Sequence, residues 1–161
     1  MALILQFMDT DLRSLLDLRE AVAPAVAQRA AENATAADLA ALEDCLAQLE
    51  REHDAPEFEG TNRRFHDLLG WASGNPAFGL LVSALHLLTR NMSTSLGYSA
   101  QERAAQLRCL GRVLHAVRMR DAAGARAQME RLTAGSTRYL TERSPGIVAQ
   151  KVRWENASRQ A

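Results

Sequence analysis

Apolar residues recur every three or four positions along most of this chain, which is the spacing of an α-helix with one buried face. Six stretches carry the pattern. They begin at Asp9 or Thr10, at Thr35, at Phe58, at Pro76, at Ser99 or Ala100, and after the Arg120-Asp121 joint. No stretch alternates apolar and polar residues between hairpin turns, so we expect no β-sheet. The pattern predicts an all-α fold, an antiparallel bundle of six to seven helices.

Local sequence signals place several helix ends. The first helix is expected to run to about Asn33, with Pro24 inside it costing one backbone hydrogen bond and introducing a kink. Thr35-Ala-Ala-Asp38 has the spacing of a capping box, so a helix should start there. Ser73-Gly74-Asn75-Pro76 combines residues that stop helices. Ser144-Pro145-Gly146 is expected to end the regular pattern.

These signals divide the chain into three parts. Residues 1–10 form an N-terminal segment or linker remnant, and residues 11–143 form the helical domain. Residues 144–161 are expected to be a C-terminal tail, with either a short helix over 147–161 or frayed chain.

Composition narrows the classes of function. The 161 residues suit one domain, and 19 basic residues balance 19 acidic ones, so no net field attracts nucleic acid or an anionic membrane. The apolar start is too short to span a membrane and lacks the basic residues of a signal peptide. Cys45 and Cys109 are too few for a disulfide framework, which favours a reduced, cytoplasmic setting.

The usual arrangements for catalysis or nucleic-acid binding are not found. The chain has no GxSxG motif, no evident Cys–His pair and no glycine loop for phosphate, so we do not expect an enzyme. The arginines of the last two helices alternate with acidic residues and lack aromatic neighbours that stack on bases. That pattern favours a solvated helix surface.

A few polar residues nevertheless fall on apolar helix faces. Arg19, Asn62 and His66 point inward by helical spacing, and His86 and Arg90 are borderline members of the same set. A lone inward histidine is usually a core residue bonded to a neighbour. Several polar groups from different helices instead favour a small-molecule cavity with a largely apolar wall. In such a cavity the planar guanidinium of Arg19 suits a carboxylate or a phosphate.

Six short motifs occur in a characteristic order between about residues 11 and 141. They are Leu18-Arg-Glu-Ala-Val22, Asp38-Leu-Ala-Ala-Leu42, Asn62-Arg-Arg-Phe-His66, Ala72-Ser-Gly-Asn-Pro76, Leu114-His-Ala-Val117 and Ala125-Arg-Ala-Gln-Met129. Together they resemble the FCD domain, the C-terminal effector-binding domain of GntR-type transcription regulators of the FadR subfamily. The resemblance implies a helical, often dimeric domain that binds a small metabolite and signals to a winged-helix DNA-binding domain.

The resemblance also raises the question of whether this domain keeps the metal ligands of the family. Many family members hold a divalent ion through an Asp or Asn and three histidines, and the first two positions match Asn62 and His66. The other two positions hold Leu110 and Leu132. His115 is five residues from Leu110 and therefore points roughly 140° away on the helix. Two ligands are too few for tight binding, so we expect no metal cofactor.

The resulting hypothesis is an effector-sensing, homodimeric domain of a FadR-type regulator, with a carboxylate as the expected effector. Contact with DNA would come only through a winged-helix domain, for which these residues leave no room. One alternative is a structural or dimerisation domain with a degenerate effector site. Another, from a different class, is a small helical enzyme that uses His66 as a base.

Overall fold

The computed structural model describes residues 10–53, 55–93 and 98–151, with side chains throughout these ranges except at 90–93. Within them the chain forms seven α-helices and no strand, which confirms the all-α prediction. The helices are α2 (Leu12–Asn33), α3 (Ala36–Arg51), α4 (Phe58–Ala72), α5 (Pro76–Ser93), α6 (Ala100–Arg118), α7 (Ala122–Arg143) and α8 (Pro145–Val148).

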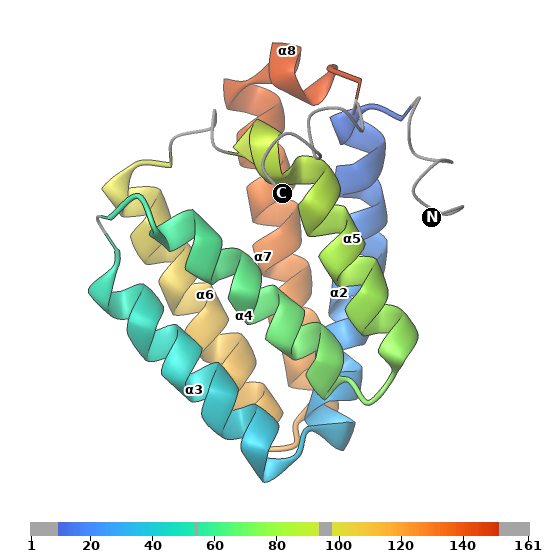
Figure 1. The fold of residues 1–161 in the computed structure, drawn as a ribbon, viewed down its shortest axis with the longest axis vertical. Helices are drawn as coiled ribbons and strands as arrows, with labels where there is room; N and C mark the ends of the chain where they lie inside the picture. The colour runs from blue at the N-terminus through green and yellow to red at the C-terminus, as the bar shows by residue number, and fades with distance from the viewer. Residues whose placement is uncertain (1–9, 54, 94–97, 152–161) are drawn as a thin grey trace.

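The six long helices pack as two layers of three (Figure 1). Helices α3, α4 and α5 form the front layer, and α2, α7 and α6 lie behind them, with consecutive helices running in opposite directions. Helix α2 packs more extensively on α7 than on any other helix, so the first and the last long helices lie side by side. The antiparallel bundle is the predicted one.

The helix ends follow the local signals, with one correction. Asp11 caps α2 by accepting a hydrogen bond from the Ser14 backbone N–H at 2.9 Å, so the cap is neither of the two residues expected. Asp9 lies outside the described residues. Thr35 and Asp38 form the predicted capping box, since each backbone N–H donates to the side chain of the other.

Helix α4 ends where predicted because Gly74 adopts a left-handed conformation, with φ of 71°. Glycine takes this conformation without steric cost. Residues Gly70 of α4 and Gly79 of α5 then let the two helices approach closely. A Cβ atom on Gly70 would lie 3.3 Å from the Gly79 Cα atom. The turn that ends α4 and the two glycines together therefore determine how α5 packs against α4.

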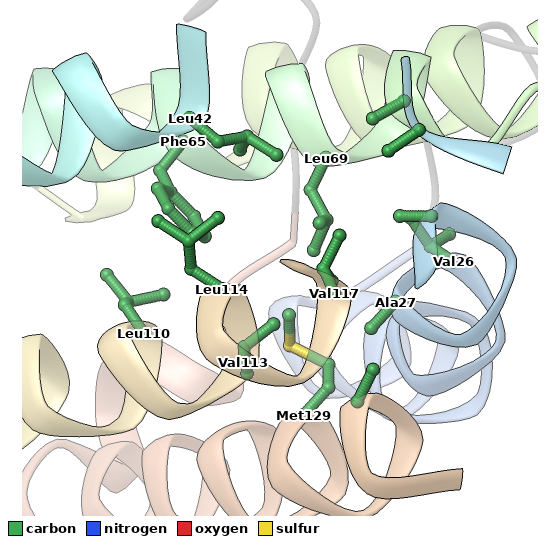
Figure 2. Close-up of a cluster of buried hydrophobic side chains, with 14 of the residues drawn as sticks. Val26, Ala27, Leu42, Phe65, Leu69, Leu110, Val113, Leu114, Val117 and Met129 are labelled. Atoms are coloured by element: carbon green, nitrogen blue, oxygen red, sulfur yellow. The ribbon is translucent and has the colours of Figure 1, made fainter. Parts of the chain in front are cut away.

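The main hydrophobic core is built from α2, α3, α4, α6 and α7, and Figure 2 shows its centre. Leu114 and Val117 of α6 face Phe65 and Leu69 of α4, and Met129 of α7 packs from the other side. Phe65, Val117 and Met129 are fully buried. Pro24 is accommodated inside α2, which continues from Leu12 to Asn33. One side of the bundle is thus solidly packed.

The long helix α7 ends at Arg143, just before Ser144-Pro145-Gly146, as predicted. A short helix, α8, follows at once and covers 145–148 rather than starting at residue 147, and residues 152–161 lie outside the described residues. Val148 is only 5% exposed, and it packs against Leu12, Leu16 and Leu140. Beyond it, the Leu12 backbone N–H donates to the Gln150 carbonyl at 3.1 Å. Residues 145–151 are therefore docked on the start of α2.

Among the described residues, no helix combines the length and the apolar character needed to cross a bilayer.

Candidate functional site

A cavity of about 130 Å³ opens between α2, α4, α5 and α7, beside the packed core. A single buried water needs on the order of 10–15 Å³, so the cavity has room for several waters or one small metabolite. Most of its wall is aliphatic. This wall comprises Leu12, Leu15, Leu16, Val22, Ala23, Val26, Leu69, Val82, Leu85, Met129, Leu132 and Leu140.

One face of α4 supplies a row of polar side chains to this wall. Glu59, Asn62, Arg63 and His66 all line the cavity. Asn62 and Arg63 follow Glu59 by three and four residues, and His66 follows them by four and three, so all four lie on one helix face. The row covers seven residues, about 10 Å at 1.5 Å per residue. Asn62 and His66 lie where the sequence placed them. Glu59 and Arg63 were missed, although their spacing from Asn62 and His66 could have shown that they share the face.

Arg19 reaches the cavity from α2, as the apolar stripe of the first helix predicted. Its Nε and Nη2 atoms are buried and have no hydrogen-bond partner among the described residues. Burial lowers the pKa of Arg19, with Tyr98 and Glu20 acting in the opposite direction. An arginine side chain keeps its proton in proteins, so this is a buried positive charge with unused donors.

His66 is held in its neutral form. Burial, and then the nearby His86 and Arg19 side chains, lower the pKa of His66 to about 3, with Asp67 partly opposing them. His66 is half-buried and lines the cavity. A neutral imidazole offers one donor and one acceptor to a ligand rather than a second charge.

His86 stands next to His66 and is oriented by an acidic neighbour. The two imidazole rings are 6.0 Å apart, edge to face. His86 Nδ1 lies 2.9 Å from Asp67 Oδ1, which also accepts a hydrogen bond from Ser83 at 3.2 Å. Because a carboxylate oxygen accepts, Nδ1 donates this hydrogen bond, which fixes the orientation of the His86 ring. The backbone of Arg90 belongs to α5, but its side chain lies outside the described residues.

The end of the cavity nearest α6 holds polar groups that the sequence did not single out. Gln106 lines it, and its Oε1 atom is buried with no hydrogen-bond partner in the described part of the chain. Glu59 Oε1 is likewise buried and has no hydrogen-bond partner among the described residues. Tyr98 completes this end, stacked on Tyr139 with ring centroids 5.2 Å apart. Gln106 lies one turn before Leu110, so the apolar stripe of α6 was a usable signal for it.

The residues present do not fit the metal that the family resemblance implies. Leu132 lines the cavity, but Leu110 is fully buried in the core and is not part of the cavity wall. No cluster of three or more His, Cys, Asp or Glu side chains that could hold an ion exists among the described residues. In addition, the unpaired Arg19 guanidinium shares the cavity and would repel a divalent cation.

Comparison with known proteins identifies the fold and the family. The FCD domain family matches residues 14–135. A solved structure of Streptococcus agalactiae GntR is similar with a TM-score of 0.68 and 23% sequence identity. The match covers 79% of this chain and only 58% of that one, so this chain spans little more than half the length of that protein. No curated protein is similar enough to count as a match. Since the family match covers well over half of the sequence, this chain belongs to the FCD domain family, the effector-binding domains of GntR-type transcription regulators.

Proposed function

We propose that this domain senses a small carboxylate, which binds in the cavity with its anionic group on Arg19. The observation that carries the proposal is the pair of buried, unpartnered donors Nε and Nη2 of Arg19. Two guanidinium donors left without acceptors inside a protein are costly, and a planar carboxylate offers two oxygens in matching geometry. The neutral ring of His66 adds a hydrogen bond without adding charge.

The wall supports a small organic acid rather than an inorganic ion. Aliphatic side chains from α2, α5 and α7 surround the polar row of α4, so a ligand gains by burying carbon as well as charge. We propose that the site binds its ligand without converting it, since the FCD domain family consists of domains of transcription regulators and is not a family of enzymes. The third sequence-based alternative, an enzyme that uses His66 as a base, is further weakened by the low pKa of that ring.

The proposal includes assembly and signalling. We propose that the domain works as a cytoplasmic homodimer and transmits the presence of its ligand to a winged-helix DNA-binding domain. The family supports this arrangement, and sedimentation equilibrium of the purified chain tests the dimer directly.

Thermal shift and calorimetry with matched ligands test the binding. The probes are unbranched two- to six-carbon mono- and dicarboxylates, each beside its neutral amide. A carboxylate at 100 times its Kd should stabilise the fold by about 2.7 kcal/mol, whereas its amide should have little effect. Arg19→Met should abolish the response. Arg29→Met should retain it, because Arg29 is on the same helix but exposed and ion-paired with Glu32 at 2.7 Å.

Two outcomes would contradict the proposal. If amides stabilise the protein as well as the acids do, Arg19 is not a carboxylate anchor. If no acid has any effect, the domain fits the alternative of a dimerisation module with a degenerate site.

A further inference from the structure

Two buried acceptors in the cavity are left without donors. Glu59 Oε1 comes from α4 and Gln106 Oε1 from α6, and neither has a hydrogen-bond partner among the described residues. Leaving a buried acceptor unpaired costs about 1–3 kcal/mol. Both atoms belong to side chains that line the cavity. At this end of the cavity two acceptor atoms therefore have no donor, whereas at the Arg19 end two donor atoms have no acceptor.

The basic residues near Glu59 do not supply the missing hydrogen-bond donor. Burial raises the pKa of Glu59, while Arg63 and Arg103 act to lower it. Neither arginine donates to Oε1, since that atom is without a partner. The unused lone pairs of Glu59 and Gln106 thus remain available to something inside the cavity.

The two ends are close enough for one small molecule. Glu59 and His66 are seven residues apart on α4, about 10 Å along the helix. The pKa of Tyr98 is affected by charged groups from both ends. Burial is the main cause of its raised pKa, while the charge of Arg19 lowers the pKa and that of Glu59 raises it. Tyr98 therefore lies near both charges.

We infer that the cavity selects small acids that also carry a hydrogen-bond donor, a hydroxyl or an ammonium group, with Glu59 and Gln106 as the specificity-determining residues. This inference rests on the proposed function, in which Arg19 holds the carboxylate. An acid without the donor would bury its carbon chain against two unsatisfied acceptors. The acid with the donor satisfies them, and the gain appears as selectivity between otherwise identical ligands.

Isothermal titration with one carbon skeleton tests the inference. The probes are butanoate and its 2-, 3- and 4-hydroxy and 2-, 3- and 4-amino derivatives. At least one derivative should bind the unmodified protein tenfold or more tightly than butanoate, which corresponds to about 1.4 kcal/mol. A preference confined to amino derivatives identifies the donor as an ammonium, and a preference for hydroxy derivatives identifies it as a hydroxyl.

Two substitutions, each with a matched control, test whether Glu59 and Gln106 cause the preference for a ligand with a donor. Glu59→Met and Gln106→Met should each shrink the affinity ratio between the preferred derivative and butanoate toward one. Glu57→Met and Gln101→Met are the matched controls, and they should leave the ratio unchanged. Both side chains are exposed, Glu57 just before the first residue of α4 and Gln101 in the first turn of α6. Since Glu59 and Gln106 lie on different helices, misfolding of one variant leaves the other informative.

The outcomes separate this inference from the proposed function. Arg19→Met should weaken butanoate and its derivatives by the same factor. If butanoate binds and the derivatives bind no better, the inference is wrong and the carboxylate site stands. The inference is also wrong if the preference survives both Glu59→Met and Gln106→Met. If no probe binds at all, both the carboxylate site and the donor selectivity are refuted.

Discussion

Replacing Arg19 by methionine should make the ligand-free protein more stable. Arg19 buries two donor atoms, Nε and Nη2, for which the described residues offer no acceptor. Removing an uncompensated buried polar group relieves its desolvation cost, about 1–3 kcal/mol per group. Methionine keeps most of the aliphatic stem, so the packing of α2 against the cavity is largely retained.

The magnitude follows from the cavity. With about 130 Å³ of free space, water can solvate part of the guanidinium, so we take the lower end of the range for each donor. Two donors then give about 2 kcal/mol of added stability for Arg19→Met. For a protein of this size that corresponds to a rise in Tm of roughly 4–8 °C.

Urea denaturation followed by circular dichroism measures this difference. Arg29→Met should change the free energy of unfolding by less than about 0.5 kcal/mol, because its ion pair is exposed. A loss of 1 kcal/mol or more in Arg19→Met would refute the reasoning, since it would mean that the guanidinium is already satisfied. A saturating carboxylate should reverse the order of stability, because only the unmodified protein binds it.

Three further perturbations test other parts of the structure. Gly74→Ala should cost about 1 kcal/mol by forcing alanine into a left-handed conformation. Gly60 lies in the first turn of α4 with no atom near its Cβ position, so Gly60→Ala should stabilise the fold by up to a similar amount in thermal unfolding. The unfolded chain binds a proton at His66 near pH 6.5 and the folded chain only near pH 3. Stability should therefore fall by up to about 1.4 kcal/mol per unit as pH drops through that window. His66→Gln should remove this slope, and a control, exposed His115→Gln, should keep it. Zinc or nickel should raise Tm by less than about 2 °C, and a large rise would reveal ligands beyond Asn62 and His66.

The sequence predicted the long helices well because their signals are local. The capping pair of Thr35 and Asp38 and the stop at Gly74 act within a few residues, and both appear in the structure as expected. The start of α2 was misplaced by one or two residues, and the packing of α8 on α2 was not predicted. Asp11 competes with two adjacent capping residues, and α8 is held by long-range packing of Val148 on Leu12 and Leu16. A contact between the two ends of a chain leaves no periodic pattern in either end.

The candidate site was predicted only in part. Arg19, Asn62 and His66 are polar residues on or beside apolar stripes, and they line the cavity for that reason. Glu59 and Gln106 were missed because acidic and amide side chains on a helix are normally solvated. Their helix-face spacing was a usable signal, but only the tertiary packing shows that their Oε1 atoms are buried without a partner.

The pairing of α2 with α7 has a consequence for synthesis. Leu12, at the start of one helix, and Leu140, near the end of the other, both line the cavity. A ribosome adds ~5–20 residues per second, so roughly 6–25 s separate the appearance of these two side chains. During that interval the nascent chain has half of the cavity wall and its charged residues, but no enclosed site. The cavity therefore becomes enclosed only after α7 has been synthesised and has packed on α2.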